Sequence, residues 1–104
     1  GNEGGDLRKH IKELVIEYKK SARAAGLYVS KSSYHIQPLI IGGANETLRI
    51  SKALYKNNIL VPAIRPPTVP KNTSRLRISI TAAHTKKDIS LLVKTASSIL
   101  NEGQ

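Results

Sequence analysis

The 104 residues suffice for one small domain and are too few for two. Apolar side chains make up 39% of the chain and glycine adds 7 residues, a composition typical of a globular domain rather than a disordered tail. The absence of cysteine excludes disulfide bonds and thiolate metal sites, and no apolar run approaches the roughly 20 residues that a membrane-spanning helix needs. The first residues do not resemble a signal peptide, so we expect a cytoplasmic protein.

The net charge is +10, from 17 Lys and Arg against 7 Asp and Glu. Such an excess can mark a module that binds RNA or another polyanion. The cations are scattered, however, with no run of five and no aromatic residues between them on which bases could stack. We therefore interpret most of them as solvated helix faces and expect no nucleic-acid partner, with a basic binding module as the alternative.

The chain contains no methionine, position 1 included. Two explanations are open on composition alone: an initiator methionine has been removed, or the natural chain is longer than these 104 residues.

The first third of the chain predicts an amphipathic helix over about residues 6–25. Asp6 could cap its amino end, and Gly26 stands where a left-handed residue commonly ends a helix. Apolar side chains at helical spacing form one stripe, made of Leu7, Ile11, Leu14, Val15, Tyr18, Ala22 and Ala25.

The middle of the chain predicts a loop, a strand over about 35–41 and a helix over about 45–57. Pro38 places the strand at an edge or lies near its start. Asn45 is the expected N-cap of the helix, which ends at Asn57 and Asn58 because asparagine tolerates the left-handed conformation.

The last part predicts two strands and a helix. Pro62 cannot donate to a ladder, so the strand over about 59–64 lies on an edge or carries a bulge. Three prolines stiffen the loop over 65–72. The strand over about 75–81 alternates, with Leu76, Ile78 and Ile80 on one face and Arg75, Arg77, Ser79 and Thr81 on the other. Thr85 and Asp88 form a capping box that opens the final helix, over about 86–100.

The order helix, strand, helix, strand, strand, helix predicts an α+β domain. Consecutive strands with a short connection pair antiparallel, so we expect a small antiparallel three-stranded sheet covered by helices. The apolar face of the last strand should meet these helices, which leaves its arginine face for water, a partner domain or an anionic ligand.

Few residues offer chemistry of their own. His10, His35 and His84 lack metal-ligand spacing, and we interpret them as surface or structural residues. Gly42 and Gly43 only weakly resemble an RNA-binding glycine loop. The arginine strand is more informative, because a guanidinium fork on a rigid strand suits a carboxylate or phosphate. A salt-bridged sheet surface explains the same pattern, and both interpretations are open.

Several motifs match a known family in order and spacing. His35–Gly42 contains Ile-Gln-Pro-Leu-Ile-Ile-Gly, and residues 63–70 read Ala-Ile-Arg-Pro-Pro-Thr-Val-Pro. Arg-Leu-Arg-Ile at 75–78 and Thr-Ala-Ala-His at 81–84 follow. On these residues the chain resembles the carboxy-terminal small domain of the 8-amino-7-oxononanoate synthases. Other α-oxoamine synthases, with another amino acid or acyl-CoA, share the arginine strand but generally lack the proline loop.

The resemblance implies a fold-type I, pyridoxal-phosphate-dependent acyltransferase. Such an enzyme condenses L-alanine with a pimeloyl thioester of CoA or acyl carrier protein, releases CO2 and forms 8-amino-7-oxononanoate for biotin synthesis. The second arginine of the family's Arg-Leu-Arg binds the amino-acid carboxylate, a role that transfers to Arg77. The threonine of the proline loop, here Thr68, lies near the substrate. The role of Arg75 is left open.

The resemblance also implies what should lie elsewhere. The family's Schiff-base lysine and cofactor-binding aspartate belong to a large domain upstream, and Lys71 lacks the residues that follow the true lysine. We therefore expect residues 1–104 to be a small domain that partners a large domain within a homodimer, and to be inactive alone. Of the two explanations for the missing methionine, this expectation favours a natural chain that is longer than these 104 residues.

The chain departs from the family pattern in three places. Asn58 and Asn72 stand where the family usually has glycine, and Gly43-Ala44 replaces its Asp-Asn. Asparagine is the least costly substitute for glycine in left-handed backbone, so we expect the fold to be kept. A stand-alone regulatory domain with the same fold is a further alternative.

Overall fold

The computed structural model describes residues 3–103 and contains six elements in the expected order. They are α1 (Glu3–Ala24), β1 (Ile36–Gly42), α2 (Ala44–Lys56), β2 (Ala63–Ile64), β3 (Ser74–Ser79) and α3 (Lys86–Glu102). The order and the three-stranded antiparallel sheet confirm the predicted α+β class.

The sheet has β3 at its centre, in the order β1-β3-β2. Leu76 of β3 lies opposite Leu39 on one side and Ala63 on the other, and both pairings are antiparallel. Because β1 and β2 are both edge strands, Pro38 in β1 and Pro62 just before β2 each lie on an edge, as predicted.

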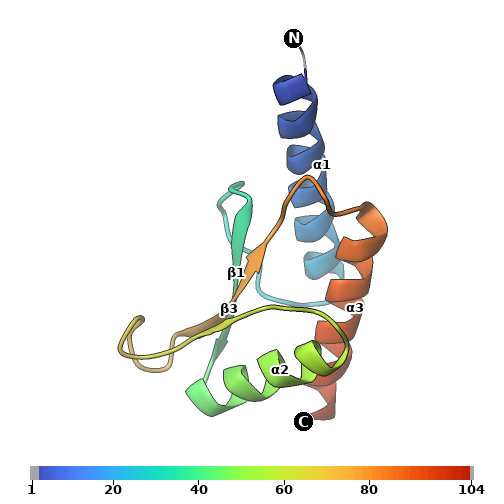
Figure 1. The fold of residues 1–104 in the computed structure, drawn as a ribbon. Helices are drawn as coiled ribbons and strands as arrows, with labels where there is room; N and C mark the ends of the chain where they lie inside the picture. Colours follow the sequence, from blue (N-terminus) through green and yellow to red (C-terminus); the bar gives the residue numbers. More distant parts are fainter. Residues whose placement is uncertain (1–2, 104) are drawn as a thin grey trace.

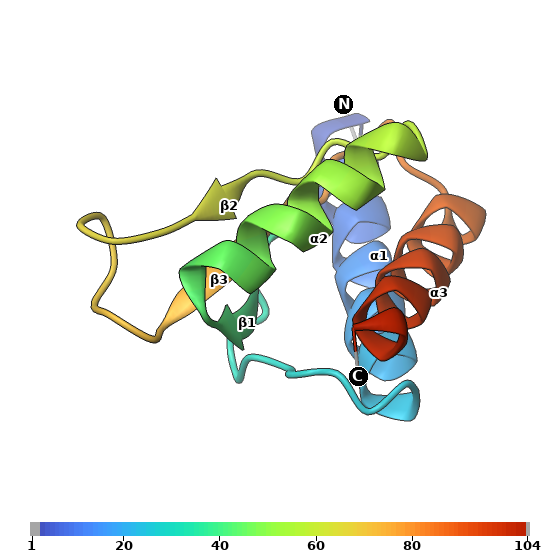
Figure 2. The same ribbon diagram turned by 90° about the horizontal axis from the view of Figure 1, so that it is seen from below.

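The helices cover one face of this sheet (Figures 1 and 2). Helices α1 and α3 lie side by side, and α2 crosses the strands. One apolar core joins the inner face of the sheet to all three helices, and its fully buried members include Leu14, Ala22, Leu39, Ile50, Leu54 and Leu76. The predicted arrangement, in which the apolar face of β3 meets the helices, is confirmed.

Helix α1 begins earlier than predicted, at Glu3, so Asp6 is not its N-cap. Asp6 lies exposed in the first turn, where a carboxylate stabilises the free N–H groups electrostatically without capping them. The helix ends at Ala24, and Gly26 just beyond it takes the predicted left-handed conformation, with φ +75°. Leu27 N–H donates to Ala22 O at 2.9 Å and Gly26 N–H to Arg23 O at 3.1 Å, the two bonds of a Schellman motif.

Helix α2 is capped by Gly43, so the prediction of Asn45 as N-cap is wrong. Gly42 has φ +111°, which turns the chain directly out of β1 and starts the helix two residues before Asn45 could cap it. The end of the helix is as predicted. Asn58 has φ 64°, and Ile59 N–H donates to Leu54 O at 3.0 Å in a second Schellman motif.

The strand predicted over 59–64 is shorter than expected, because only Ala63 and Ile64 pair with β3. Residues 59–61 are held by α2 instead: Ser51 Oγ donates to Val61 O at 2.6 Å. Pro62 has no N–H with which to continue the ladder.

The remaining boundaries differ from the predictions by one or two residues. Strand β3 ends at Ser79 because Thr81 enters a turn, where its N–H donates to His84 Nδ1 at 2.9 Å. The predicted capping box of α3 is confirmed: Thr85 Oγ1 accepts from Asp88 N–H, and Asp88 Oδ2 accepts from Thr85 N–H. Within residues 3–103, no helix is both long enough and apolar enough to cross a bilayer.

Candidate functional site

The sheet face that the helices leave uncovered is the first candidate, and we call it the open face. Strand register defines it, because residues directly opposite one another share a face: Arg77 lies opposite Pro38, and Arg75 lies between Ile40 and Ile64. Its members are Ile36, Pro38, Ile40, Ile64, Arg75, Arg77 and Ser79. None of these side chains is buried in this chain.

The two arginines of the open face differ in what they bind. The guanidinium of Arg75 is folded back on its own strand, where Nε and Nη2 donate to Thr73 O at 3.0 and 2.9 Å. Arg77 is exposed, and its side chain makes no hydrogen bond or ion pair within the part of the chain that the structure describes. Arg77 is therefore the arginine that can present all its donors to another molecule.

The interpretation of this face as a salt-bridged surface is wrong for both arginines. Across residues 3–103, the one ion pair joins Arg49 to Glu46 at 2.6 Å, and it lies in α2. The hydrogen bond from Arg49 lowers the pKa of the Glu46 carboxyl below its usual range. No carboxylate of the described residues lies within 4 Å of the guanidinium of Arg75 or Arg77.

The proline loop leaves the open face at the end nearer Arg75, and it projects beyond the body of the molecule (Figures 1 and 2). Thr68 is exposed, and its N–H donates to Arg65 O at 3.0 Å. Asn72 has φ 66° and closes the loop, together with two hydrogen bonds from Thr73 to Pro70 O. The structure shows no hydrogen bond between Thr68 and Arg77 among these residues.

The histidines have structural roles where their contacts are clear. His84 Nδ1 accepts a hydrogen bond from Thr81 N–H, and His10 Nε2 lies 3.0 Å from His84 O. These contacts join α1 to the turn before α3, in agreement with the predicted structural role. Among residues 3–103, no group of three His, Asp or Glu side chains is arranged to hold a metal ion.

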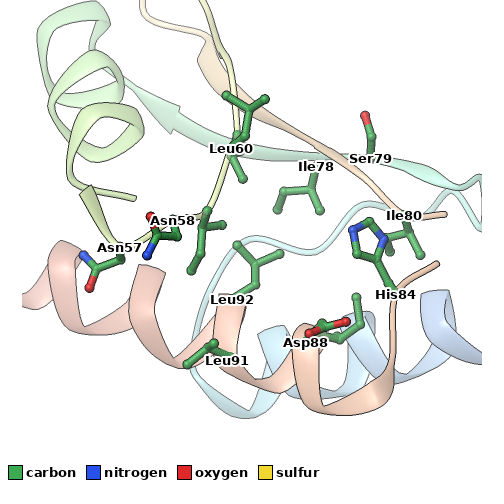
Figure 3. A pocket seen from close by; sticks show the side chains of 13 residues that line it. Asn57, Asn58, Leu60, Ile78, Ser79, Ile80, His84, Asp88, Leu91 and Leu92 are labelled. Atoms are coloured by element: carbon green, nitrogen blue, oxygen red, sulfur yellow. The ribbon is translucent and has the colours of Figure 1, made fainter. Parts of the chain in front are cut away.

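The second candidate site is a cleft on the helix side of β3, which the sequence did not predict. We call it the β3-edge cleft; it has a volume of about 690 Å³ and lies between the α2–β2 connection, the end of β3 and the first turns of α3 (Figure 3). Apolar side chains dominate its lining, among them Leu60, Ile78, Ile80, Leu91 and Leu92. No local motif could have revealed it, because three segments far apart in the sequence form it.

The fold matches part of much larger enzymes. Serine palmitoyltransferase from S. paucimobilis, solved with a bound PLP adduct, superposes with a TM-score of 0.85 at 20% identity, over 96% of this chain and 26% of that chain. The 8-amino-7-oxononanoate synthase of Francisella tularensis gives a TM-score of 0.82 at 24% identity, over 94% of this chain and 28% of its own. The fold of this chain is therefore that of a small α+β part of these two larger enzymes.

The model of the aminotransferase class I and II family matches residues 2–95, and the chain belongs to this family. Among curated relatives, the 8-amino-7-oxononanoate synthase of Hahella chejuensis is 47% identical over 87 residues, 84% of this chain. That of Methylobacillus flagellatus is 44% identical over 86 residues, 83% of this chain. The chain spans 22% of the length of each of these two relatives. The resemblance predicted from the motifs is confirmed.

The lysines of this chain lie at the surface of the domain. A Schiff-base lysine must be held in a protected pocket. Every lysine here is exposed except Lys19, which is half-buried and donates from Nζ to Ser32 O at 2.8 Å. Lys71, in the proline loop, is exposed as well.

Proposed function

We propose that this chain is the carboxy-terminal small domain of a pyridoxal-phosphate-dependent acyltransferase of the α-oxoamine synthase type. The enzyme condenses L-alanine with a pimeloyl thioester, of CoA or acyl carrier protein, and forms 8-amino-7-oxononanoate with release of CO2 for biotin synthesis. The relatives at 44% and 47% identity support this substrate pair over other α-oxoamine synthases.

The observation that carries the proposal is the free guanidinium of Arg77. It stands on a rigid central strand, beside apolar residues such as Pro38, and no carboxylate of the described residues neutralises it. An arginine fork in such a setting binds a carboxylate through two parallel hydrogen bonds. Arg77 therefore binds and orients the carboxylate of L-alanine.

The bound cofactor supplies the electron sink that makes alanine reactive. The residues of this chain hold and shield the substrate. Arg77 fixes the carboxylate, the apolar side chains of the open face keep water from it, and Thr68 in the proline loop lies at the acyl-chain end of the substrate. Arg75 holds the backbone at Thr73, which fixes the exit of the proline loop.

The rest of the active site lies in the partners of this domain. A large domain of the same polypeptide carries the lysine that binds the cofactor, and two copies of the polypeptide form a cytoplasmic homodimer. Residues 1–104 alone have no activity in this proposal, because their lysines lie on the surface.

The experiment is Arg77→Ala in the full-length synthase that carries these residues. Hydrogen bonds to a charged group contribute roughly 1.5–3 kcal/mol, so the KM for L-alanine should rise about 10- to 150-fold. The KM for the pimeloyl thioester should change little, because this substrate has no α-carboxylate. Steady-state kinetics with each substrate varied in turn measures both effects.

Arg23→Ala is the matched control, since Arg23 is also an exposed arginine but lies on α1, away from the open face. It should leave both KM values unchanged. An unchanged KM for L-alanine in the Arg77→Ala enzyme would rule out the carboxylate role.

A further inference from the structure

Strand β2 pairs with only the first half of β3. Arg77 N–H donates to Pro62 O at 3.0 Å, but proline has no N–H to return to the carbonyl of Arg77. Before Pro62 the chain turns away to α2, where Ile59 N–H donates to Leu54 O at 3.0 Å. The ladder between β2 and β3 therefore stops at Arg77.

The second half of β3 keeps an unpaired edge. Ile80 N–H donates to His35 O at 2.9 Å, so Ile78 and Ile80 direct their backbone groups toward β1. The backbone groups of successive residues in a strand point to opposite edges of that strand. The N–H and C=O of Ser79 and the C=O of Arg77 therefore point toward the side on which β2 lies. Within residues 3–103 these three groups have no hydrogen-bond partner.

Ser79, which carries two of these groups, lines the β3-edge cleft between Ile78 and Ile80 (Figure 3). Two of its leucines are unusually open for large apolar side chains: Leu60 is 79% exposed and Leu91 is 55% exposed. Folded proteins generally protect a bare strand edge, and an edge beside exposed leucines is a template for another strand.

We propose that an extended segment of the longer polypeptide enters the β3-edge cleft and pairs with Arg77–Ser79 as a fourth strand. The inference rests on the proposed function, because it takes the chain to be one domain of a synthase whose relatives are matched over only 22% of their length. A strand provides a donor for Arg77 O and both partners for Ser79. Its apolar side chains pack on Leu60, Leu91 and Leu92.

A strand fits this site better than a small apolar ligand does. The unpaired groups repeat along one edge at the spacing of a backbone, and a single small molecule cannot satisfy all three.

The test is amide hydrogen exchange, resolved to single residues, in the 104-residue chain and in the full-length synthase. In the short chain the Ser79 amide should exchange rapidly, whereas the Arg77 amide, bonded to Pro62 O, should be protected. In the full-length protein the Ser79 amide should exchange slower by about 100-fold, since an added strand requires local opening before exchange. Equal exchange of Ser79 in both proteins would overturn the proposal.

Leu60→Lys and Leu91→Lys test whether the cleft is the place of docking. Both side chains are exposed, so each variant of the short chain should keep its melting temperature. In the full-length protein each should speed the exchange of Ser79 back toward its rate in the short chain. Ile16→Lys on α1, where Ile16 is 58% exposed, is the control and should leave Ser79 protected.

Protection of Ser79 that survives both cleft variants would assign it to another contact and overturn the proposal. The outcome is independent of the alanine kinetics of Arg77→Ala. A synthase that needs Arg77 but leaves Ser79 unprotected would retain the proposed function and lose only the added strand.

Discussion

At the scale of single residues, Tyr18 shows how burial controls a titration. Its side chain is 1% exposed, and its hydroxyl has no hydrogen-bond partner among the described residues. Burial raises the pKa of Tyr18 to about 12, because the phenolate would lose its hydration. An unfolded tyrosine ionises near pH 10.

The neutral form of Tyr18 should contribute fully to the free energy of unfolding below about pH 10. This contribution should be lost as the pH rises toward about 12. Tyr18→Phe removes an unpaired hydroxyl, so this variant should be at least as stable as the parent at pH 8 and should lose less stability between pH 9 and 11. Urea unfolding at these pH values measures both. Tyr55→Phe, at a side chain that is 68% exposed, should behave like the parent. Equal losses in the parent and Tyr18→Phe would contradict the prediction.

Two asparagines hold backbone conformations that glycine adopts at lower cost. Asn58 has φ 64° and Asn72 has φ 66°. Asn58→Gly and Asn72→Gly should each raise the free energy of unfolding by about 0.5 kcal/mol, since the strain removed slightly exceeds the added freedom of the unfolded chain. Asn57→Gly is the control: its φ is −98°, so glycine relieves nothing there and should destabilise the protein. A loss of stability in Asn58→Gly comparable to that in Asn57→Gly would contradict the argument.

At the scale of elements, local chemistry sets the start of α3. Thr85 and Asp88 exchange hydrogen bonds at 3.1 and 2.9 Å. The backbone N–H and the hydroxyl of Thr85 lower the pKa of the Asp88 carboxyl. A lowered pKa means that the stabilisation is present above the unfolded pKa and is lost as the pH falls through the folded pKa.

Thr85→Ala should lower the free energy of unfolding by about 1 kcal/mol at pH 7, because it removes the acceptor for the Asp88 N–H. Asp88→Asn should destabilise the protein at pH 7, and its difference from the parent should shrink as the pH falls below 4. Thermal unfolding of the parent and both variants, measured from pH 7 to pH 2.5, tests both predictions. Ser90→Ala, at an exposed position one turn further along α3, should change little at any pH.

The sequence predicted those elements whose signals are local. A few neighbouring residues determine each of three features: the capping box at Thr85, the helix stop at Gly26 and the alternation of β3. The length of β2 could not be predicted, because residues 59–61 are held by Ser51 and Leu54 of α2 rather than by their own pattern. The alternation placed Arg75 and Arg77 on one face, but only the structure shows that Arg75 is bound to Thr73 and Arg77 is free.

At the scale of the whole molecule, one core holds the elements together. Leu76 is fully buried at the centre of the sheet, within the cluster that includes residues of α1, α2 and α3. Leu76→Ala should therefore lower the free energy of unfolding by roughly 2–5 kcal/mol. The variant should still unfold in one cooperative transition, with no second transition for any part of the domain. Leu7→Ala, at a position that is 53% exposed, should cost less than about 0.5 kcal/mol. Denaturant unfolding followed by two spectroscopic probes decides between one cooperative transition and two.

The pairing of α1 with α3 has a consequence for how the domain is made. These helices lie side by side, yet one is the first element of the chain and the other is the last (Figure 1). During synthesis the apolar stripe of α1 emerges from the ribosome long before α3 exists to cover it. The domain can close its core only after the whole of α3 has been translated, and until then the apolar stripe of α1 has no α3 to cover it.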